Sequence, residues 1–132
     1  MEKVYIVGAC RTPIGRMGGS ISEIPVADLG ATVIREAIIR SRVEFSDVEH
    51  VIMGCVLQAG QGQNVARQAA LKAGLDFNST ALTLNAVCGS GLESVNVAAR
   101  MIQCGGSWSN CRWRYGKHVY VTICFIKREI WI

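Results

Sequence analysis

The chain has 132 residues, of which 50% are hydrophobic and 18% charged, a balance that suits one globular domain and excludes a disordered tail. The net charge of +4 is scattered over most of the chain, and the apolar run at residues 4–7 is too short for a signal peptide or a membrane span. The six cysteines form neither a CxxC pair nor a zinc-like spacing, which favours free thiols in a reducing, cytoplasmic compartment.

Strand-like and helix-like apolar patterns alternate along the chain. Residues 4–7 are typical of a buried strand, and residues 8–22 of a glycine-rich loop. Apolar residues then recur at helical spacing between Val26 and Ile38, after Pro25 at a favourable start position. The remaining predicted elements are a strand over 50–57, a helix over 64–73 closed by Gly74, a strand over 81–87 and a helix over 88–102. The order βαβαβα predicts an α/β fold with a mostly parallel sheet.

Cys88 lies where the last predicted strand runs into a helix, between Val87 and Gly89. A thiol there lies near the first N–H groups and the positive end of the helix dipole, both of which favour the thiolate. The same N–H groups can hold an oxyanion, and the glycines allow a substrate carbonyl to approach closely. The pattern therefore indicates a nucleophile. The alternative is a buried cysteine that acts as a small hydrophobic residue, which is the usual state of a free thiol.

Other features of the sequence give weaker indications of a catalytic or binding site. The loop Gly15, Gly18 and Gly19 lacks the Lys-Ser/Thr of a P-loop and the GxGxxG dinucleotide pattern. Residues 58–68 are rich in Gln and Gly, as in an ordinary surface loop. His50 has no placed partner and is expected to be structural.

Three motifs resemble the thiolase family, and in particular its biosynthetic branch, the acetyl-CoA C-acetyltransferases. They are RTPIGRMGG at residues 11–19, QAGQGQNVARQAALKAG at 58–74 and VCGSGLESV at 87–95. The motifs occur in family order and at family-like spacing, and the resemblance covers residues 1–103. It implies an incomplete amino-terminal half of a thiolase-like fold that lacks the later strands. It also makes residues 58–68 a candidate for a subunit interface.

The resemblance assigns a role to Cys88, which would take up an acyl group as a thioester. A second acetyl-CoA would then attack that thioester to give acetoacetyl-CoA, and the reverse reaction is thiolysis. The implied substrates are acyl-CoA thioesters, with no metal and no further cofactor, and the intact family is expected to be homo-oligomeric. The family's activating His, second Cys and further oxyanion site come from a later part of a longer chain, so this chain is expected to be inactive alone. Ketoacyl synthases share the fold and the cysteine nucleophile but differ around the motif.

The resemblance stops at Cys104, and residues 104–132 differ in character. This tail contains all three Trp and three of the six Cys. Permitted codons for the tail, read one nucleotide later, spell AGEAGAIVAGGMENMSMSPYALLKERYG, which resembles the family's continuation. We therefore expect residues 1–103 to be a partial thiolase amino-terminal domain and 104–132 a frame-shifted, non-homologous tail.

Two further questions stay open from the sequence. The alternative to a frame shift is a genuine basic tail, since cations and aromatic residues alternate at residues 112–115, although no nucleic acid and no membrane partner is expected. Residues 119–126 are apolar and β-prone, so they either pair as a surrogate strand or promote aggregation. The alternative function is a non-catalytic remnant that at most associates with intact thiolase subunits.

Overall fold

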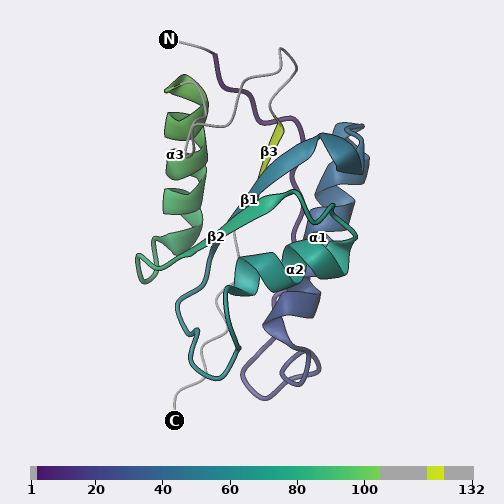
Figure 1. Ribbon diagram of the computed structural model, residues 1–132. Coiled ribbons are helices and arrows are strands. Elements are labelled where there is room, and N and C mark those ends of the chain that lie inside the picture. Colours follow the sequence, from purple (N-terminus) through teal and green to yellow (C-terminus); the bar gives the residue numbers. More distant parts are fainter. Residues whose placement is uncertain (1–2, 105–118, 124–132) are drawn as a thin grey trace.

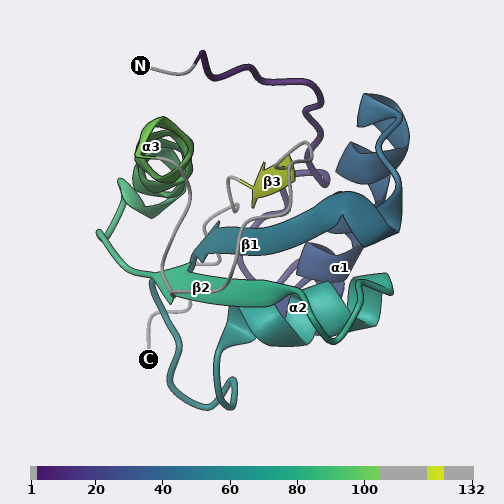
Figure 2. The same ribbon diagram turned by 45° about the horizontal axis from the view of Figure 1, so that its top comes forward.

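The computed structural model describes residues 3–104 and 119–123. A parallel three-stranded sheet lies at its centre, in the order β2-β1-β3 (Figure 1). Helices α1 and α2 cover one face of this sheet and α3 covers the other (Figure 2). The helices are α1 (Val26–Ser41), α2 (Val65–Ala73) and α3 (Ser90–Gln103), and the strands are β1 (Val48–Gly54), β2 (Thr80–Leu84) and β3 (Val119–Ile123). The expected parallel α/β sheet is confirmed.

The core lies on both faces of β1, because successive side chains of a strand point to opposite faces. Val51 and Met53 join the cluster formed with α1 and α2, in which Ile34 and Ile38 of α1 are buried. Small residues of α2 let the two helices approach each other closely: Ala66, Ala69, Ala70 and Ala73. Helices α1 and α2 are thus formed with their apolar faces on the sheet, whereas on α3 Leu92, expected on the apolar face, is 68% exposed.

Helix α2 begins and ends as the sequence predicts. The Asn64 side chain accepts a hydrogen bond from the N–H of Arg67, which satisfies one of the donors left free at a helix start. Gly74 ends the helix with φ +93°, in the left-handed region that glycine enters without a steric cost. Between α1 and β1, the short 3-10 helix Phe45–Asp47 turns the chain.

The expected strand at residues 4–7 is wrong. The structure assigns no strand there, and Tyr5, Ile6 and Val7 are 71%, 81% and 64% exposed. The segment that follows is attached to α1 instead, through Arg40 Nη1 donating to the Ala9 carbonyl at 3.1 Å. The sheet pairs β1 with β2 on one side and with β3 on the other, so residues 4–7 do not lie beside β1. Among the described residues the order is therefore αβαβαβ, not βαβαβα.

Strand β3 answers one question that the sequence left open. Residues 119–123 pair in parallel with β1, with Val121 opposite Val51 and Ile123 opposite Met53, so this part of the tail is a surrogate strand. Residues 124–126 of the same apolar stretch lie outside the described part of the chain. In Figure 2, β3 lies between α3 and α1, and it contacts both.

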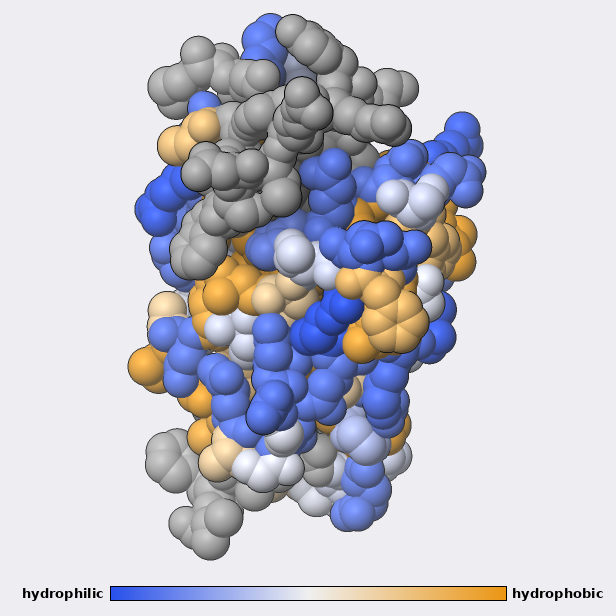
Figure 3. Space-filling model, in the orientation of Figure 1, coloured by the Kyte–Doolittle hydropathy of each residue, from blue (hydrophilic) through white to orange (hydrophobic). Residues whose placement is uncertain are grey.

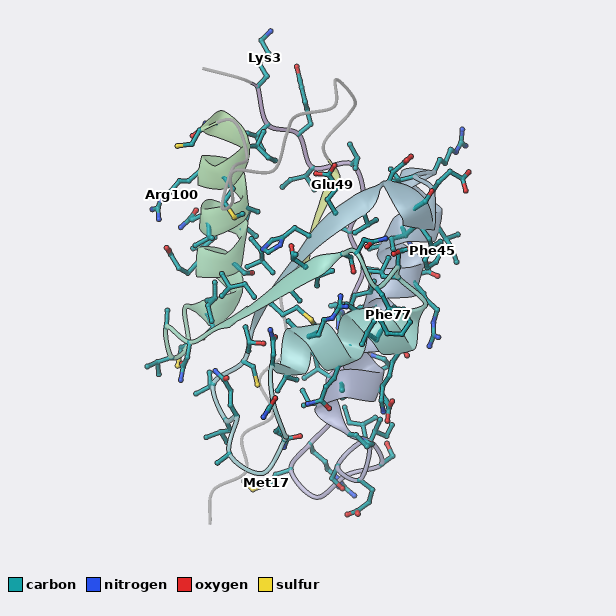
Figure 4. The ribbon with its side chains drawn as sticks, in the orientation of Figure 1. Lys3, Met17, Phe45, Glu49, Phe77 and Arg100 are labelled. Carbon is teal, nitrogen blue, oxygen red and sulfur yellow. The ribbon has the colours of Figure 1, made fainter. Side chains whose placement is uncertain are left out.

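The face of the molecule seen in Figure 3 mixes polar and apolar residues. Phe77 is 82% exposed on the loop that joins α2 to β2 (Figure 4). Within residues 3–104 and 119–123, no helix combines the length and the apolar composition that a bilayer crossing requires.

Candidate active site

Cys88 lies beyond the carboxyl end of β2, in the turn that leads into α3. Strand β2 ends at Leu84, and the chain leaves the sheet before it reaches Cys88. Because β1 and β2 are parallel, Cys55 after β1 lies at the same edge of the sheet, and its N–H donates to the Leu84 carbonyl at 2.9 Å. Cys88 is exposed, so it is not the buried, inert cysteine of the alternative interpretation.

The residue before Cys88 has an unusual backbone. Val87 has φ +50°, in the left-handed region, where a β-branched residue is a steric outlier. Such a conformation costs about 1–3 kcal/mol and persists only where surrounding contacts hold it. Three hydrogen bonds do so: Asn85 Oδ1 accepts from the Val87 N–H at 2.9 Å, and the Val87 carbonyl accepts from Ser90 N at 3.1 Å and Ser90 Oγ at 2.6 Å. The turn that presents Cys88 is therefore strained and held from both sides.

The turn is also fixed to the rest of the fold. Asn85 Nδ2 donates to the Val56 carbonyl at 3.1 Å, which ties the turn to the segment after β1. Ser90 is 4% exposed and packs on Gly54, where a Cβ atom would lie 2.5 Å from the Ser90 carbonyl carbon. The first turn of α3 can lie this close to β1 only because residue 54 has no side chain.

Two N–H groups near Cys88 are already engaged. The sequence predicts that the first N–H groups of this helix can hold an oxyanion, and Gly89 and Ser90 lie at its start. In the structure they donate to the carbonyls of Ala86 and Val87, at 3.0 and 3.1 Å, and so close the turn instead. These two donors are engaged within the turn, so an oxyanion at Cys88 needs other donors.

The first turn of α3 carries a charge of its own. The hydrogen bond from Asn96 Nδ2, at 3.1 Å, and the nearby Arg100 hold the pKa of Glu93 below its usual value. Arg100 Nη1 lies 3.0 Å from the Glu93 carboxylate and projects from α3 away from the sheet (Figure 4). Glu93 is thus ionised at neutral pH, as a helix amino terminus prefers.

The other three described thiols differ from Cys88 in exposure or in position. Burial raises the pKa of Cys10, whose Sγ lies 3.2 Å from the Val33 carbonyl oxygen. Burial also raises the pKa of Cys55, which is half-buried. Cys104 is exposed at the other end of α3. Of the four thiols that the described residues contain, Cys88 alone combines exposure with a position before a helix start.

His50 lies far from Cys88, as its expected structural role requires. It pairs with Thr80 across the strands, and its Nδ1 shares a hydrogen bond with Thr80 Oγ1. Gly54, at the carboxyl edge, lies four steps along β1 from His50, roughly 13 Å at the rise per residue of a strand. His50 is therefore not the base that would activate Cys88.

His50 should make stability depend on pH. Burial lowers its pKa in the folded chain, so in mildly acidic solution the unfolded chain binds the proton first. Its contribution to stability is therefore complete above about pH 6.5 and is lost as the pH falls from there through the folded pKa. We expect His50→Gln to lose less stability than the parent between about pH 7.5 and pH 5, measured by urea unfolding. An equal loss in both chains would contradict this, since the two chains differ only at position 50.

Among the described residues, neither glycine-containing loop makes a hydrogen bond to Cys88. Residues 58–68 are held by their own contacts, because Gln68 Nε2 donates to the Gln61 and Gln63 carbonyls at 2.7 and 2.9 Å. Whether this loop forms a subunit interface stays a prediction. In the glycine-rich loop, Met17 is 73% exposed and lies far from α3 (Figure 4).

This arrangement defines an α/β protein with an exposed cysteine at a strained turn between strand and helix. The family model described as thiolase, N-terminal domain, matches residues 4–108. The chain therefore belongs to the thiolase family.

Relatives and a solved structure agree with this family. The chain is 52% identical over 104 residues to the acetyl-CoA acetyltransferase of Syntrophomonas wolfei, covering 79% of this chain and 26% of the relative. It is 53% identical over 105 residues to that of Cupriavidus necator, covering 80% and 27%. The crystal structure of Acat5 thiolase from Ascaris suum in complex with coenzyme A superimposes with a TM-score of 0.76 at 35% identity, covering 86% of this chain and 33% of that one. The chain thus spans about a quarter of the length of the curated relatives it matches.

Proposed function

We propose that this chain is the part of a thiolase-type acyltransferase that carries the acyl acceptor, Cys88. The observation that supports this most is the exposed Cys88 thiol at a held turn, within a chain of the thiolase family. The relatives' name, acetyl-CoA acetyltransferase, and the coenzyme A in the Ascaris suum complex make acyl-CoA thioesters the proposed substrates. The proposal includes no metal or other cofactor, a reducing cytoplasmic location and, for the intact family, a homo-oligomer.

The proposed step is a thioester exchange. The Cys88 thiolate attacks the carbonyl carbon of an acyl-CoA, a bond forms between Sγ and that carbon, and the carbon–sulfur bond to coenzyme A breaks. Coenzyme A leaves as a thiolate and takes up a proton, so the chain gains an acyl group in place of the cysteine proton. In the reaction that the resemblance to thiolases implies, the cycle closes when a second acetyl-CoA, deprotonated at its methyl group, attacks this thioester.

We propose that the described residues support only this first step. His50 lies at the opposite end of β1, and the Gly89 and Ser90 N–H groups are engaged in the turn. A general acid or base contributes typically ~10²–10⁴-fold to a rate, so its absence leaves acyl transfer slow. The expected result for the isolated chain is a slow stoichiometric acylation without turnover.

Mass spectrometry of the chain after incubation with acetyl-CoA tests this function. We expect one acetyl group on the parent chain, located at Cys88 by peptide mapping, and none on Cys88→Ala. Cys104→Ala is the matched control, because Cys104 is also exposed but lies at the far end of α3, and it should keep the adduct. An adduct that survives in Cys88→Ala, or a parent that gains none, would contradict the proposal and favour the non-catalytic remnant that associates with intact subunits.

We further propose that residues 1–103 are a partial thiolase domain and that residues 104–132 come from a shifted reading frame. The change in composition at Cys104 and the family-like string in the shifted frame support this. Sequencing the coding DNA from the codon of Asn85 to well past that of Ile132 is the test. One added or missing base that restores the string supports the proposal. A confirmed frame makes the tail a genuine part of the protein.

A further inference from the structure

The buried hydroxyl of Ser90 makes hydrogen bonds to the backbone of both Ala86 and Val87. Ser90 Oγ accepts from the Ala86 N–H at 2.9 Å and donates to the Val87 carbonyl at 2.6 Å. Ala86 and Val87 are the two residues immediately before Cys88. The hydroxyl therefore links the first residue of α3 to the two residues that determine how the chain enters Cys88.

The conformation that this hydroxyl holds is one that Val87 would not adopt alone. At φ +50° the β-branched side chain crowds its own backbone, and the Val87 side chain is 64% exposed, so packing around it offers little compensation. The backbone hydrogen bonds of Val87 therefore offset the steric cost of its left-handed conformation. Ser90 provides two of the three, one through its N–H and one through its hydroxyl.

Ser90 itself has little freedom to move. It is 4% exposed, and its carbonyl carbon, Cβ and carbonyl oxygen lie against Gly54 at the end of β1. Because Ser90 packs on Gly54, its hydroxyl is fixed relative to β1. Through this hydroxyl the turn before Cys88 is also held relative to β1. A group built in this way sets where a neighbouring side chain points.

We propose that Ser90 is a positioning residue for Cys88: its hydroxyl holds Val87 in the left-handed conformation and so directs the Cys88 thiol toward its acyl donor. This inference rests on the proposed function of Cys88 as acyl acceptor. Ser90 acts through the backbone and does not touch the substrate. It should affect the maximal rate of acylation rather than the affinity for acetyl-CoA.

The test compares Ser90→Ala with Ser94→Ala in the full chain. Ser94 is also fully buried on α3, and its hydroxyl donates to the Gly91 carbonyl at 2.6 Å without touching the turn. With acetyl-CoA, we expect Ser90→Ala to lower the maximal rate of Cys88 acylation roughly tenfold at an unchanged half-saturating concentration, as a displaced nucleophile does. Ser94→Ala should acylate at the parent's rate. Equal rates in the parent and Ser90→Ala, or equal losses in both variants, would overturn the proposal.

A second background separates positioning from a general loss of folding. Glycine enters the left-handed region without a steric cost, so Val87→Gly should remove most of the need for the Ser90 hydroxyl. We expect Ser90→Ala to slow acylation much less in the Val87→Gly chain than in the parent, a coupling that a double-mutant cycle measures. An undiminished effect in that background contradicts the positioning role.

Alkylation of Cys88 by iodoacetamide keeps the inference distinct from the proposed function. It reports the exposure and orientation of the thiol without any acyl-CoA. A chain that acetyl-CoA does not acylate, but whose Cys88 alkylation falls in Ser90→Ala and not in Ser94→Ala, would refute the function and retain the positioning role. Unchanged alkylation and unchanged acylation in Ser90→Ala would refute the positioning role alone.

Discussion

Gly54→Ala should destabilise the fold by about 3 kcal/mol, the upper part of the usual range for a group forced into a packed site. The added Cβ would lie 2.5 Å from the Ser90 carbonyl carbon and 2.7 Å from both Ser90 Cβ and the Ser90 oxygen. Two of these atoms are backbone, so no side-chain rotation relieves the overlap. Either α3 moves away from the sheet or β1 shifts against α1 and α2. Urea unfolding followed by circular dichroism measures the loss.

Gly89→Ala is the matched control for this substitution. Gly89 also flanks the start of α3, but its φ of −86° is ordinary for an L-residue, and an added Cβ would meet only the Ala86 oxygen, at 3.3 Å. We expect its effect to stay within about 1 kcal/mol, because the lower entropy of the unfolded chain offsets a small local adjustment. Similar losses for both substitutions would show that the contact with Ser90 is not what makes Gly54 necessary.

Local signals in the sequence predicted those elements whose formation depends on local chemistry. The helix over 64–73 is confirmed nearly to the residue, since Asn64 and Gly74 provide caps that act within one turn. The parallel sheet is confirmed because alternating strands and helices leave few other topologies. The predicted strand at residues 4–7 is wrong, because its formation depends on distant parts of the chain. An apolar run becomes a strand only where it pairs with another strand, and the place beside β1 is taken by residues 119–123, which lie far from residues 4–7 in the sequence.

The candidate site was likewise predicted only in part from the sequence. Cys88 was identified from its place in the sequence, and its exposure agrees with that reading. The supports of the turn were missed, because Gly54 and Ser90 become neighbours only when β1 and α3 pack. One signal was present in part: Asn85 stands two residues before Val87, the spacing at which an Asn side chain bonds to the backbone. The positive φ of a valine had no sequence signal at all.

Removal of the tail after Cys104 should convert the chain from a folded species into an aggregating one. Strand β3 covers one edge of β1, the strand whose Val51 and Ile52 are fully buried. Without residues 119–123 that edge presents unpaired N–H and C=O groups beside apolar side chains, the arrangement that invites pairing between molecules. We expect the 1–104 chain to elute as large assemblies in size-exclusion chromatography and to lose cooperative unfolding.

The chain 1–126 separates this effect from truncation as such. It keeps the segment Val119–Ile123 and removes only residues 127–132, so it should elute and unfold like the full chain. A monomeric 1–104 chain with an unchanged unfolding midpoint would mean that β3 adds nothing to the sheet. If 1–104 aggregates and 1–126 does not, a tail that we propose to have arisen from a shifted frame supplies the backbone pairing that β1 requires. Pairing of this kind depends on an extended backbone and an apolar sequence rather than on a particular ancestry, so an unselected segment is able to provide it.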